Sequence, residues 1–186
     1  REDFSPQEYY QLLRTADSIP VTAHITPFRF QEEYEKFLAD GVEELLVVTI
    51  NSGASATNSA AHMAAKLFGE EHPGHGMEIK IVDSRTYSQA YGWQLCRVAE
   101  MLDGGASVAE AARYLEEAFA KTEIVLAPYT LRYIKQSGRI SAAAAFAGEL
   151  LGLKPVITLI DGESVVQQKV RGDRQVVPAL AAYFKE

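Results

Sequence analysis

Small polar residues cluster where an apolar run gives way to an alanine-rich segment. The apolar run 47–50 is followed by "NSGASATN" at 51–58, and alanines with helical spacing come next. The polar members of this loop, with the glycine among them, are Asn51, Ser52, Gly53, Ser55, Thr57 and Asn58. In an open parallel α/β sheet, ligands bind where the carboxyl end of a strand leads into a helix. The backbone amides and the dipole of that helix attract an anion.

The residue types in this loop limit the kind of anion. The loop lacks the Gly-Lys pair of a Walker A loop, and it is not a Rossmann fingerprint. A carboxylate needs only two or three hydroxyl or amide donors, so it is favoured over a phosphate. The alternative is that Ser55 only caps the helix, which is a common role for serine.

A second group of polar residues lies at strand ends and in turns. Asp83 and Ser84 end another apolar run and either meet the first loop at the same sheet edge or cap the next helix. Arg139 follows Gly138 in a tight turn, where it either contacts a partner or is solvated.

Lys169 and Arg171 lie two residues apart on a predicted strand, so they share a face. They are candidates for contact with an acidic partner or a phosphate. Charges that protect an edge strand from aggregation have the same pattern. His24 and His62 are isolated, and no metal-ligand spacing connects them with His72 and His75, so we expect no metal site.

Helix and strand signals alternate along most of the chain. "SPQE" at 5–8 and "SVAE" at 107–110 are capping boxes, and Thr26-Pro27 begins another helix. We expect helices over 5–15, 26–41, 56–68, 88–102 and 107–120, and strands over 45–50, 78–83 and 123–128. This order predicts a layered α/β fold with a mostly parallel sheet and helices on both faces. The continuously apolar strand at 45–50 is expected to be central in that sheet.

The pattern changes after Gly152. Two strands flank an Asp161-Gly162 turn, which predicts an antiparallel hairpin, and a terminal helix is predicted over 176–186. We therefore expect an α/β lobe at 1–152 and part of a second α+β lobe at 153–186. A hairpin and one helix cannot bury a core alone. Val156, Ile157 and Leu159 are expected to lack a partner layer on at least one face, unless flanking residues outside this sequence or a second copy of the chain cover them.

Composition excludes several partner classes. The 186 residues are 47% hydrophobic and carry a net charge of −7, which argues against nucleic acid or an anionic membrane as partner. No apolar run reaches the roughly 18 residues of a membrane span. Cys96 is the only cysteine, so the chain has no internal disulfide framework and a reducing cytoplasm is the expected setting.

Five stretches in consistent order resemble one family. They are "SIPVTAHITP", "INSGASATNSAA", "IVDSRTYSQAYG", "LRYIKQSGRIS" and "LLGLKPVITLIDGE" followed by "KVR". Together they resemble the landmarks of the DegV family, cytoplasmic fatty-acid-binding proteins that present an acyl chain to a fatty acid kinase. Several positions depart from the family pattern: Ala23, His24, Asn51, Ala56 and Ser137. Asn51 stands where the family usually has serine. The family also has an earlier strand and a further C-terminal segment that this sequence does not show.

The resemblance implies a function and a set of binding residues. Thr22 and Ser55 are then the expected side-chain donors to the fatty acid carboxylate, with the backbone amides of Ala56 and Thr57 beside them. His24, Asn51, Ser52, Asp83, Ser84, Arg139, Lys169 and Arg171 are the expected secondary or partner contacts. The implied role is an acyl carrier for phospholipid synthesis, without cofactor or metal, and with a homodimer as a further expectation.

Two other classes stay open at this point. A serine-dependent acyl hydrolase or acyltransferase needs a base and an orienting acid beside Ser55. His24 or His62, with Asp83, offer these groups, but no strained Gly-x-Ser-x-Gly elbow is present. The third class is an interaction module that has no ligand.

Overall fold

The computed structural model describes residues 4–137, 141, 146, 152–160 and 162–185. Its helices and strands, in chain order, are α1 (Pro6–Thr15), α2 (Pro27–Ala39), β1 (Glu44–Thr49), α3 (Thr57–Glu71), β2 (Glu78–Asp83), α4 (Gln89–Asp103), α5 (Val108–Phe119), β3 (Ile124–Leu126), α6 (Arg132–Ser137), β4 (Leu153–Ile160), β5 (Glu163–Arg171), a 3-10 turn (Asp173–Gln175) and α8 (Val176–Tyr183). Arg139 lies outside the described residues. The mixed α/β class with a parallel sheet, helices and an antiparallel sheet is confirmed.

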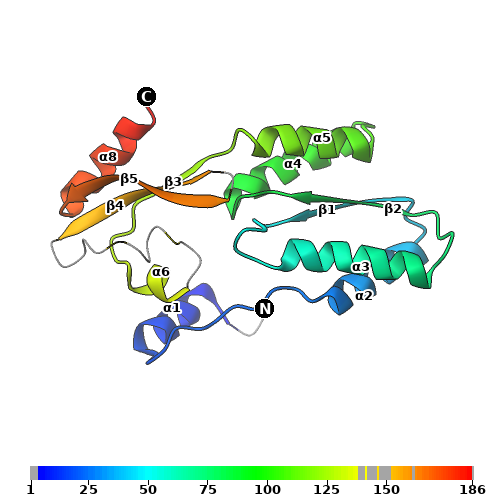
Figure 1. Ribbon diagram of the computed structural model, residues 1–186, viewed down its shortest axis with the longest axis horizontal. Coiled ribbons are helices and arrows are strands. Elements are labelled where there is room, and N and C mark those ends of the chain that lie inside the picture. Colours follow the sequence, from blue (N-terminus) through cyan, green and yellow to red (C-terminus); the bar gives the residue numbers. More distant parts are fainter. Residues whose placement is uncertain (1–3, 138–140, 142–145, 147–151, 161, 186) are drawn as a thin grey trace.

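The parallel sheet consists of β1 and β2, paired in register from Glu44 opposite Glu78 to Thr49 opposite Asp83. Figure 1 shows α2 and α3 on one side of this sheet and α4 and α5 on the other. Side chains alternate along β1, because successive residues of a strand point to opposite faces. Leu45 and Val47 pack with the α2–α3 cluster around Tyr34, and Leu46 and Val48 pack with the α4–α5 cluster.

Both faces of the parallel sheet are therefore covered, as the apolar run of β1 predicts. The expected central position of β1 in the sheet is not seen, since β2 is the only partner of β1 among the described strands. Tyr34 and Phe68 are the buried aromatic residues of the α2–α3 cluster, with 1% and 0% of their surface exposed, and burial raises the pKa of Tyr34 to about 12.

The second sheet is antiparallel, with the order β3-β4-β5. The expectation that the strand at 123–128 extends the parallel sheet is wrong, because Ile124 to Leu126 pair with Leu159 to Ile157 of β4. A strand of three residues carries too little pattern to fix its partner or direction. The division of the chain at Gly152 stays a prediction, and the pairing of β3 with β4 favours a boundary before β3.

The antiparallel sheet is also covered on both faces. Leu131, Phe146 and Ile157 form a cluster on one face, and Val156, Val176 and Ala179 form a cluster on the other. Val156, Ile157 and Leu159 are 1%, 0% and 9% exposed. The expectation that these residues lack a partner layer is therefore wrong. Helix α8 covers one face, and Leu131, Phe146 and the short helix α6, which the sequence did not predict, contribute to the other.

The capping boxes that the sequence predicts at Ser5 and Ser107 are both present, and Thr26 caps α2. In the described part of the chain, every helix is too short or too polar to cross a membrane.

Candidate ligand site

The loop between β1 and α3 folds around the side chain of Asn51 and the hydroxyl of Ser55. The N–H of Gly53 donates to Asn51 Oδ1 at 2.8 Å, and the N–H of Ala54 donates to the Asn51 carbonyl at 3.3 Å. These bonds form a tight turn that ends in Ser55, directly before the start of α3. Ser55 is half-buried and Thr57 is buried.

Ser55 supports the first turn of α3 without being its N-cap. The N-cap is Ala56, which has no side chain that can cap. Ser55 Oγ instead accepts the N–H of Thr57 at 3.2 Å and lies 2.8 Å from Thr57 Oγ1. The Thr57 N–H thus has a partner within the loop, and its expected role as a donor to a carboxylate stays a prediction. Among the described residues, the N–H groups of Asn58 and Ser59 show no hydrogen bond, so they are better placed to meet an anion.

Thr22 and Ser55, the two expected carboxylate donors, lie beside the same two cavities. The first, here called the polar cavity, measures about 450 Å³ and is lined by Thr22, Ala23, His24, Ser52, Ala54, Ser55, Ala56, Asn58 and Ser59. The second, here called the mixed cavity, measures about 410 Å³ and is lined by Thr22, Ala23, His24, Ile25, Phe30, Val48, Thr49, Ile50, Ser55, Thr57 and Tyr91. Hydroxyl groups and apolar side chains therefore lie next to each other at this place.

The apolar part of the mixed cavity was not predicted as a site from the sequence. Phe30 belongs to α2, Val48 to β1 and Tyr91 to α4, so three separate elements bring these side chains together. Each of them fits a helix or strand pattern that a buried core also produces. The only signal that could have found them is their nearness in sequence to the polar residues: Ile25 follows His24, and Val48 precedes Asn51 by three positions.

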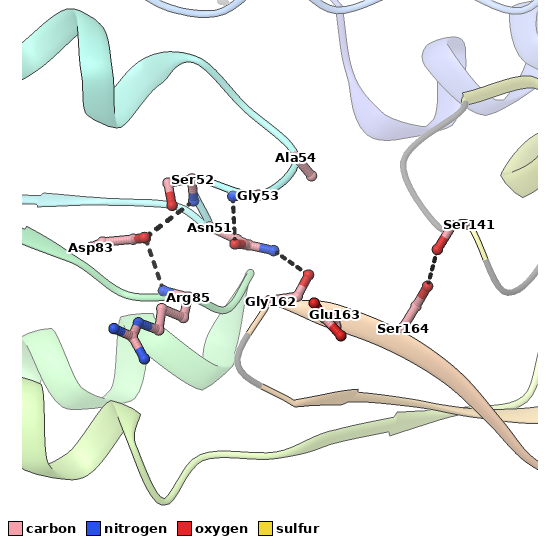
Figure 2. Close-up of a pocket in the computed structure, with 10 residues that line it drawn as sticks. All are labelled: Asn51, Ser52, Gly53, Ala54, Asp83, Arg85, Ser141, Gly162, Glu163 and Ser164. Carbon is pink, nitrogen blue, oxygen red and sulfur yellow. Dashed lines mark hydrogen bonds between the residues drawn. The ribbon is translucent and has the colours of Figure 1, made fainter.

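A third cavity of about 800 Å³, here called the hairpin cavity, lies where the loops after β1 and β2 face the β4–β5 turn (Figure 2). It is lined by Asn51, Ser52, Gly53, Ala54, Asp83, Arg85, Ser141, Gly162, Glu163 and Ser164. Ser52 and Ala54 line both this cavity and the polar cavity. The carboxylate of Asp83 accepts the N–H groups of Ser52 at 3.2 Å and Arg85 at 3.0 Å. Asp83 therefore joins the loops after β1 and β2, as expected of residues at one sheet edge.

Ser84 has a different role from Asp83. Its side chain is fully buried, and its hydroxyl donates to the Thr86 carbonyl at 3.2 Å. Neither Asp83 nor Ser84 caps α4, whose N-cap is Ser88 and has no side-chain bond. The helix-cap interpretation of these two residues is therefore wrong. Ser84 shapes the turn after β2 and does not line any of the three cavities described above.

Among the described residues, the hydrogen bonds of Ser55 do not form a Ser-His-Asp triad. The described hydrogen bonds of its hydroxyl go to Thr57, and no bond joins Ser55 to His24 or His62. His62 is exposed on α3, and the described partners of Asp83 are backbone amides. Nucleophilic catalysis requires a base in hydrogen-bond reach of the serine.

Lys169 and Arg171 lie on β5, far along the chain from the loop between β1 and α3, and both are exposed. Lys169 Nζ lies 5.6 Å from the ring centroid of Phe146, a cation–π contact. Their role as partner contacts stays a prediction.

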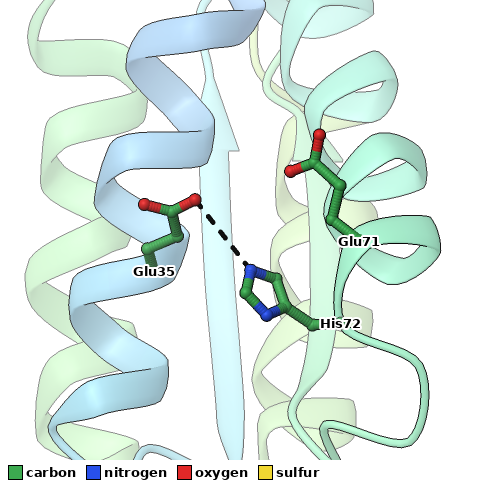
Figure 3. Close-up of side chains that lie close together, drawn as sticks. All are labelled: Glu35, Glu71 and His72. Carbon is green, nitrogen blue, oxygen red and sulfur yellow. Dashed lines mark ion pairs between the residues drawn. The ribbon is translucent and has the colours of Figure 1, made fainter.

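Three titratable side chains approach one another at the far end of α3 (Figure 3). One ligand atom from each of Glu35, Glu71 and His72 lies within 4.8 Å of the others. His72 Nε2 is 3.9 Å from Glu35 Oε1, and Glu71 accepts a bond from Gln31. Both glutamates are exposed, and these contacts account for the arrangement, so the absence of a metal site stays the expectation.

Comparison with known proteins extends over the whole chain. The family model described as "Uncharacterised protein, DegV family" matches residues 1–186. A DegV domain-containing protein of Clostridium perfringens is 27% identical over 99% of this chain and 64% of its own length. A fatty acid-binding protein of Thermotoga maritima is 27% identical over 100% of this chain and 63% of its own length.

Solved structures agree with the sequence comparison. The structure described as fatty acid binding of a DegV family protein from Thermus thermophilus has a TM-score of 0.78 and 30% identity, covering 98% of this chain and 64% of the other. A DegV lipid binding protein from Thermotoga maritima has a TM-score of 0.78 and 26% identity, over 97% and 62%. The chain thus spans less than two thirds of the length of these relatives. It belongs to the DegV family.

Proposed function

We propose that the protein binds a long-chain fatty acid with its carboxylate at the hydroxyls of Ser55 and Thr22. The observation that carries this is the shared lining of the polar and mixed cavities: Thr22 and Ser55 line both cavities, and apolar side chains also line the mixed cavity. A ligand with a single polar head and a long apolar tail matches this combination of a polar cavity and a cavity with apolar lining. The relatives described above as fatty acid-binding support the same ligand class.

The energetics of such a ligand divide between tail and head. Burying about 14 methylene groups at roughly 0.8 kcal/mol each contributes on the order of 11 kcal/mol before ordering costs. The carboxylate adds little affinity, but an unpaired buried carboxylate costs several kcal/mol. The hydroxyls of Ser55 and Thr22 and the amides of Asn58 and Ser59 are the donors that offset this cost, with the Ala56 amide as the further expected donor.

The lining of the head-group region also supports presentation of the ligand to a kinase. Among the residues that the structure describes, no Lys or Arg lines the polar or mixed cavity. A carboxylate held by uncharged donors keeps its nucleophilic oxygen available to accept a phosphoryl group from ATP on a separate fatty acid kinase. We propose that the protein acts in the cytoplasm as a non-enzymatic carrier of this kind for phospholipid synthesis, and a homodimer stays a prediction.

The test is the ligand itself. Mass spectrometry of the organic extract of the denatured protein is expected to show stoichiometric fatty acid. Palmitate added to delipidated protein should raise the melting temperature, because a ligand that binds only the folded state stabilises it by mass action. Hexadecanol is the matched control, since it has the same tail without the carboxylate. Equal binding of acid and alcohol would contradict the head-group site, and turnover of a chromogenic ester would favour the hydrolase instead.

A further inference from the structure

Asn51 connects the head-group loop, residues 50–56 between β1 and α3, to the β4–β5 hairpin of the other sheet. Its side chain is 1% exposed. Nδ2 donates to the hydroxyl of Tyr87 at 2.7 Å and to the carbonyl of Gly162 at 3.0 Å, across 111 positions of sequence. Oδ1 accepts the N–H of Gly53 at 2.8 Å, and Figure 2 shows this bond and the bond to Gly162 on one side chain.

The orientation of the Asn51 amide follows from its partners. The Gly53 N–H can only donate and the Gly162 carbonyl can only accept, so Oδ1 must face Gly53 and Nδ2 must face Gly162. The backbone N–H of Asn51 also donates to the Thr86 carbonyl, and its carbonyl accepts from Ala54. Every polar group of Asn51 therefore has a partner, and these partners come from three different segments of the chain.

The contact with the hairpin is also sterically tight. Gly162 has a φ of +81°, and a Cβ built on it would lie 2.5 Å from Asn51 Oδ1. Only glycine allows the hairpin backbone to approach the amide this closely. A serine at position 51 is too short to reach Gly53, Tyr87 and Gly162 together.

We propose that Asn51 is a positioning residue that couples carboxylate recognition at Ser55 to the position of the β4–β5 hairpin. This inference rests on the proposed function, because it assigns Ser55 to the carboxylate. Gly53, which Asn51 holds, lies two residues before Ser55, so a shift of the amide is transmitted directly to the head-group donors. By linkage, a ligand that orders the loop must order the hairpin turn, and a fixed hairpin must favour the ligand.

The first measurement is hydrogen exchange of the peptide that contains Glu163 to Val166, with and without palmitate. In the wild-type protein, palmitate is expected to slow exchange in this peptide several-fold, although none of its residues lines the polar or mixed cavity. In Asn51→Ser the peptide should exchange faster without ligand, and palmitate should no longer slow it.

The second measurement is the ratio of palmitate affinity to hexadecanol affinity. Asn51→Ser should lower this ratio about five- to tenfold, because the loop no longer holds Ser55 against the carboxylate while the tail site is unchanged. A residue that only stabilises the fold would lower the melting temperature and leave the ratio as it is.

Tyr87→Phe and Tyr114→Phe form a matched pair in case Asn51→Ser does not fold. Each removes one hydroxyl from a half-buried tyrosine: Tyr87 bonds Asn51, and Tyr114 bonds Gln94 at 2.8 Å between α5 and α4. Tyr87→Phe should lower the ratio two- to threefold, and Tyr114→Phe should not change it.

Palmitate binding with an unchanged ratio and unchanged exchange in both Asn51→Ser and Tyr87→Phe overturns the inference. Failure of the wild-type protein to bind palmitate at all overturns the proposed function instead.

Discussion

The hydroxyl of Ser55 serves the fold as well as the candidate site. Ser55 Oγ accepts the N–H of Thr57, the first residue of α3. Ser55 therefore satisfies one helix N–H, as a capping side chain would, although it precedes the N-cap residue Ala56. Thr22 differs, because it lies exposed in the segment before α2. The two expected donors should therefore respond differently when their hydroxyls are removed.

Ser55→Ala and Thr22→Val are expected to weaken palmitate binding by at least about tenfold each, because hydrogen bonds to a charged group contribute roughly 1.5 to 3 kcal/mol. Since we propose that both hydroxyls meet one carboxylate, we expect the double variant to lose less affinity than the sum of the two single variants. Ser55→Ala should also lower the free energy of unfolding by about 1 kcal/mol, as for loss of a cap. Thr22→Val should lower it by less than about 0.5 kcal/mol, because substitutions at exposed positions usually have small effects on stability.

Palmitate affinity and urea unfolding should be measured on the wild type, the two single variants and the double variant. Together these measurements separate a loss of binding from a loss of stability. A Ser55→Ala protein with lower stability and intact affinity would show that the loop is an ordinary strand-to-helix turn.

Sequence patterns could select candidate residues for the local part of the site, but they could not indicate the contacts that depend on distant residues. Ser55, Thr22 and Asp83 could be selected because they lie at strand ends or within family landmarks. Asn51 was selected as a secondary contact, but its bond to the Gly162 carbonyl could not be predicted, since a backbone acceptor has no residue-specific signal. The same holds for Tyr87, whose hydroxyl becomes important only because the turn after β2 brings it to Asn51.

At the scale of the elements, helices with strong caps were predicted to within one or a few residues. Ser5 and Ser107 each accept the N–H of a glutamate three positions later, and that glutamate accepts the serine N–H in return. The strand β3 was predicted at the right place but in the wrong sheet. Its direction depends on β4, which begins 27 positions after β3 ends, so local periodicity contains no information on it.

The two capping boxes allow the same serine-to-alanine substitution to be compared in a helix that buries core residues, α5, and in one that buries none, α1. Ser107→Ala should lower the free energy of global unfolding by about 1 kcal/mol, because α5 buries Ala111, Ala112, Leu115 and Phe119 and must form for the core to form. Ser5→Ala should change it by less than about 0.5 kcal/mol, since α1 has no buried residue and can fray alone. Urea unfolding of both variants at neutral pH measures the difference, and equal losses would contradict it.

The effect of Ser107→Ala also depends on pH. The N–H and then the hydroxyl of Ser107 donate to the Glu110 carboxylate and hold its pKa below the ordinary value of 4.5. A carboxyl whose pKa is lowered by folding stabilises the folded state above its unfolded pKa, and this contribution is lost as the pH falls through the folded pKa. The difference between wild type and Ser107→Ala should therefore shrink as the pH is lowered below about 4.5.

At the scale of the whole molecule, the two sheets have separate cores. The clusters around Tyr34 and Leu115 contain residues of α2 to α5, β1 and β2, whereas the clusters around Ile157 and Val176 contain residues from β3 onward, Phe146 included. The four clusters have no described residue in common. In Figure 1 the two sheets lie end to end along the longest axis of the molecule. A chain with two such cores does not have to unfold in one step.

We expect the part that contains the parallel sheet and the part that contains the antiparallel sheet to unfold at different urea concentrations. Hydrogen exchange measured by mass spectrometry at increasing urea can follow peptides of α3 and α5 separately from peptides of β4 and β5. Palmitate should raise the midpoint of the α3 and α5 peptides more, because the described lining of the mixed cavity comes from α2, β1, α3, α4 and the loops before α2 and after β1, and none of it comes from β3 to β5. Asn51→Ser should widen the gap between the two midpoints in the presence of palmitate, since it removes the bond through which the ligand stabilises the hairpin. Coincident midpoints with and without palmitate, in both proteins, would show that the two cores form one cooperative unit.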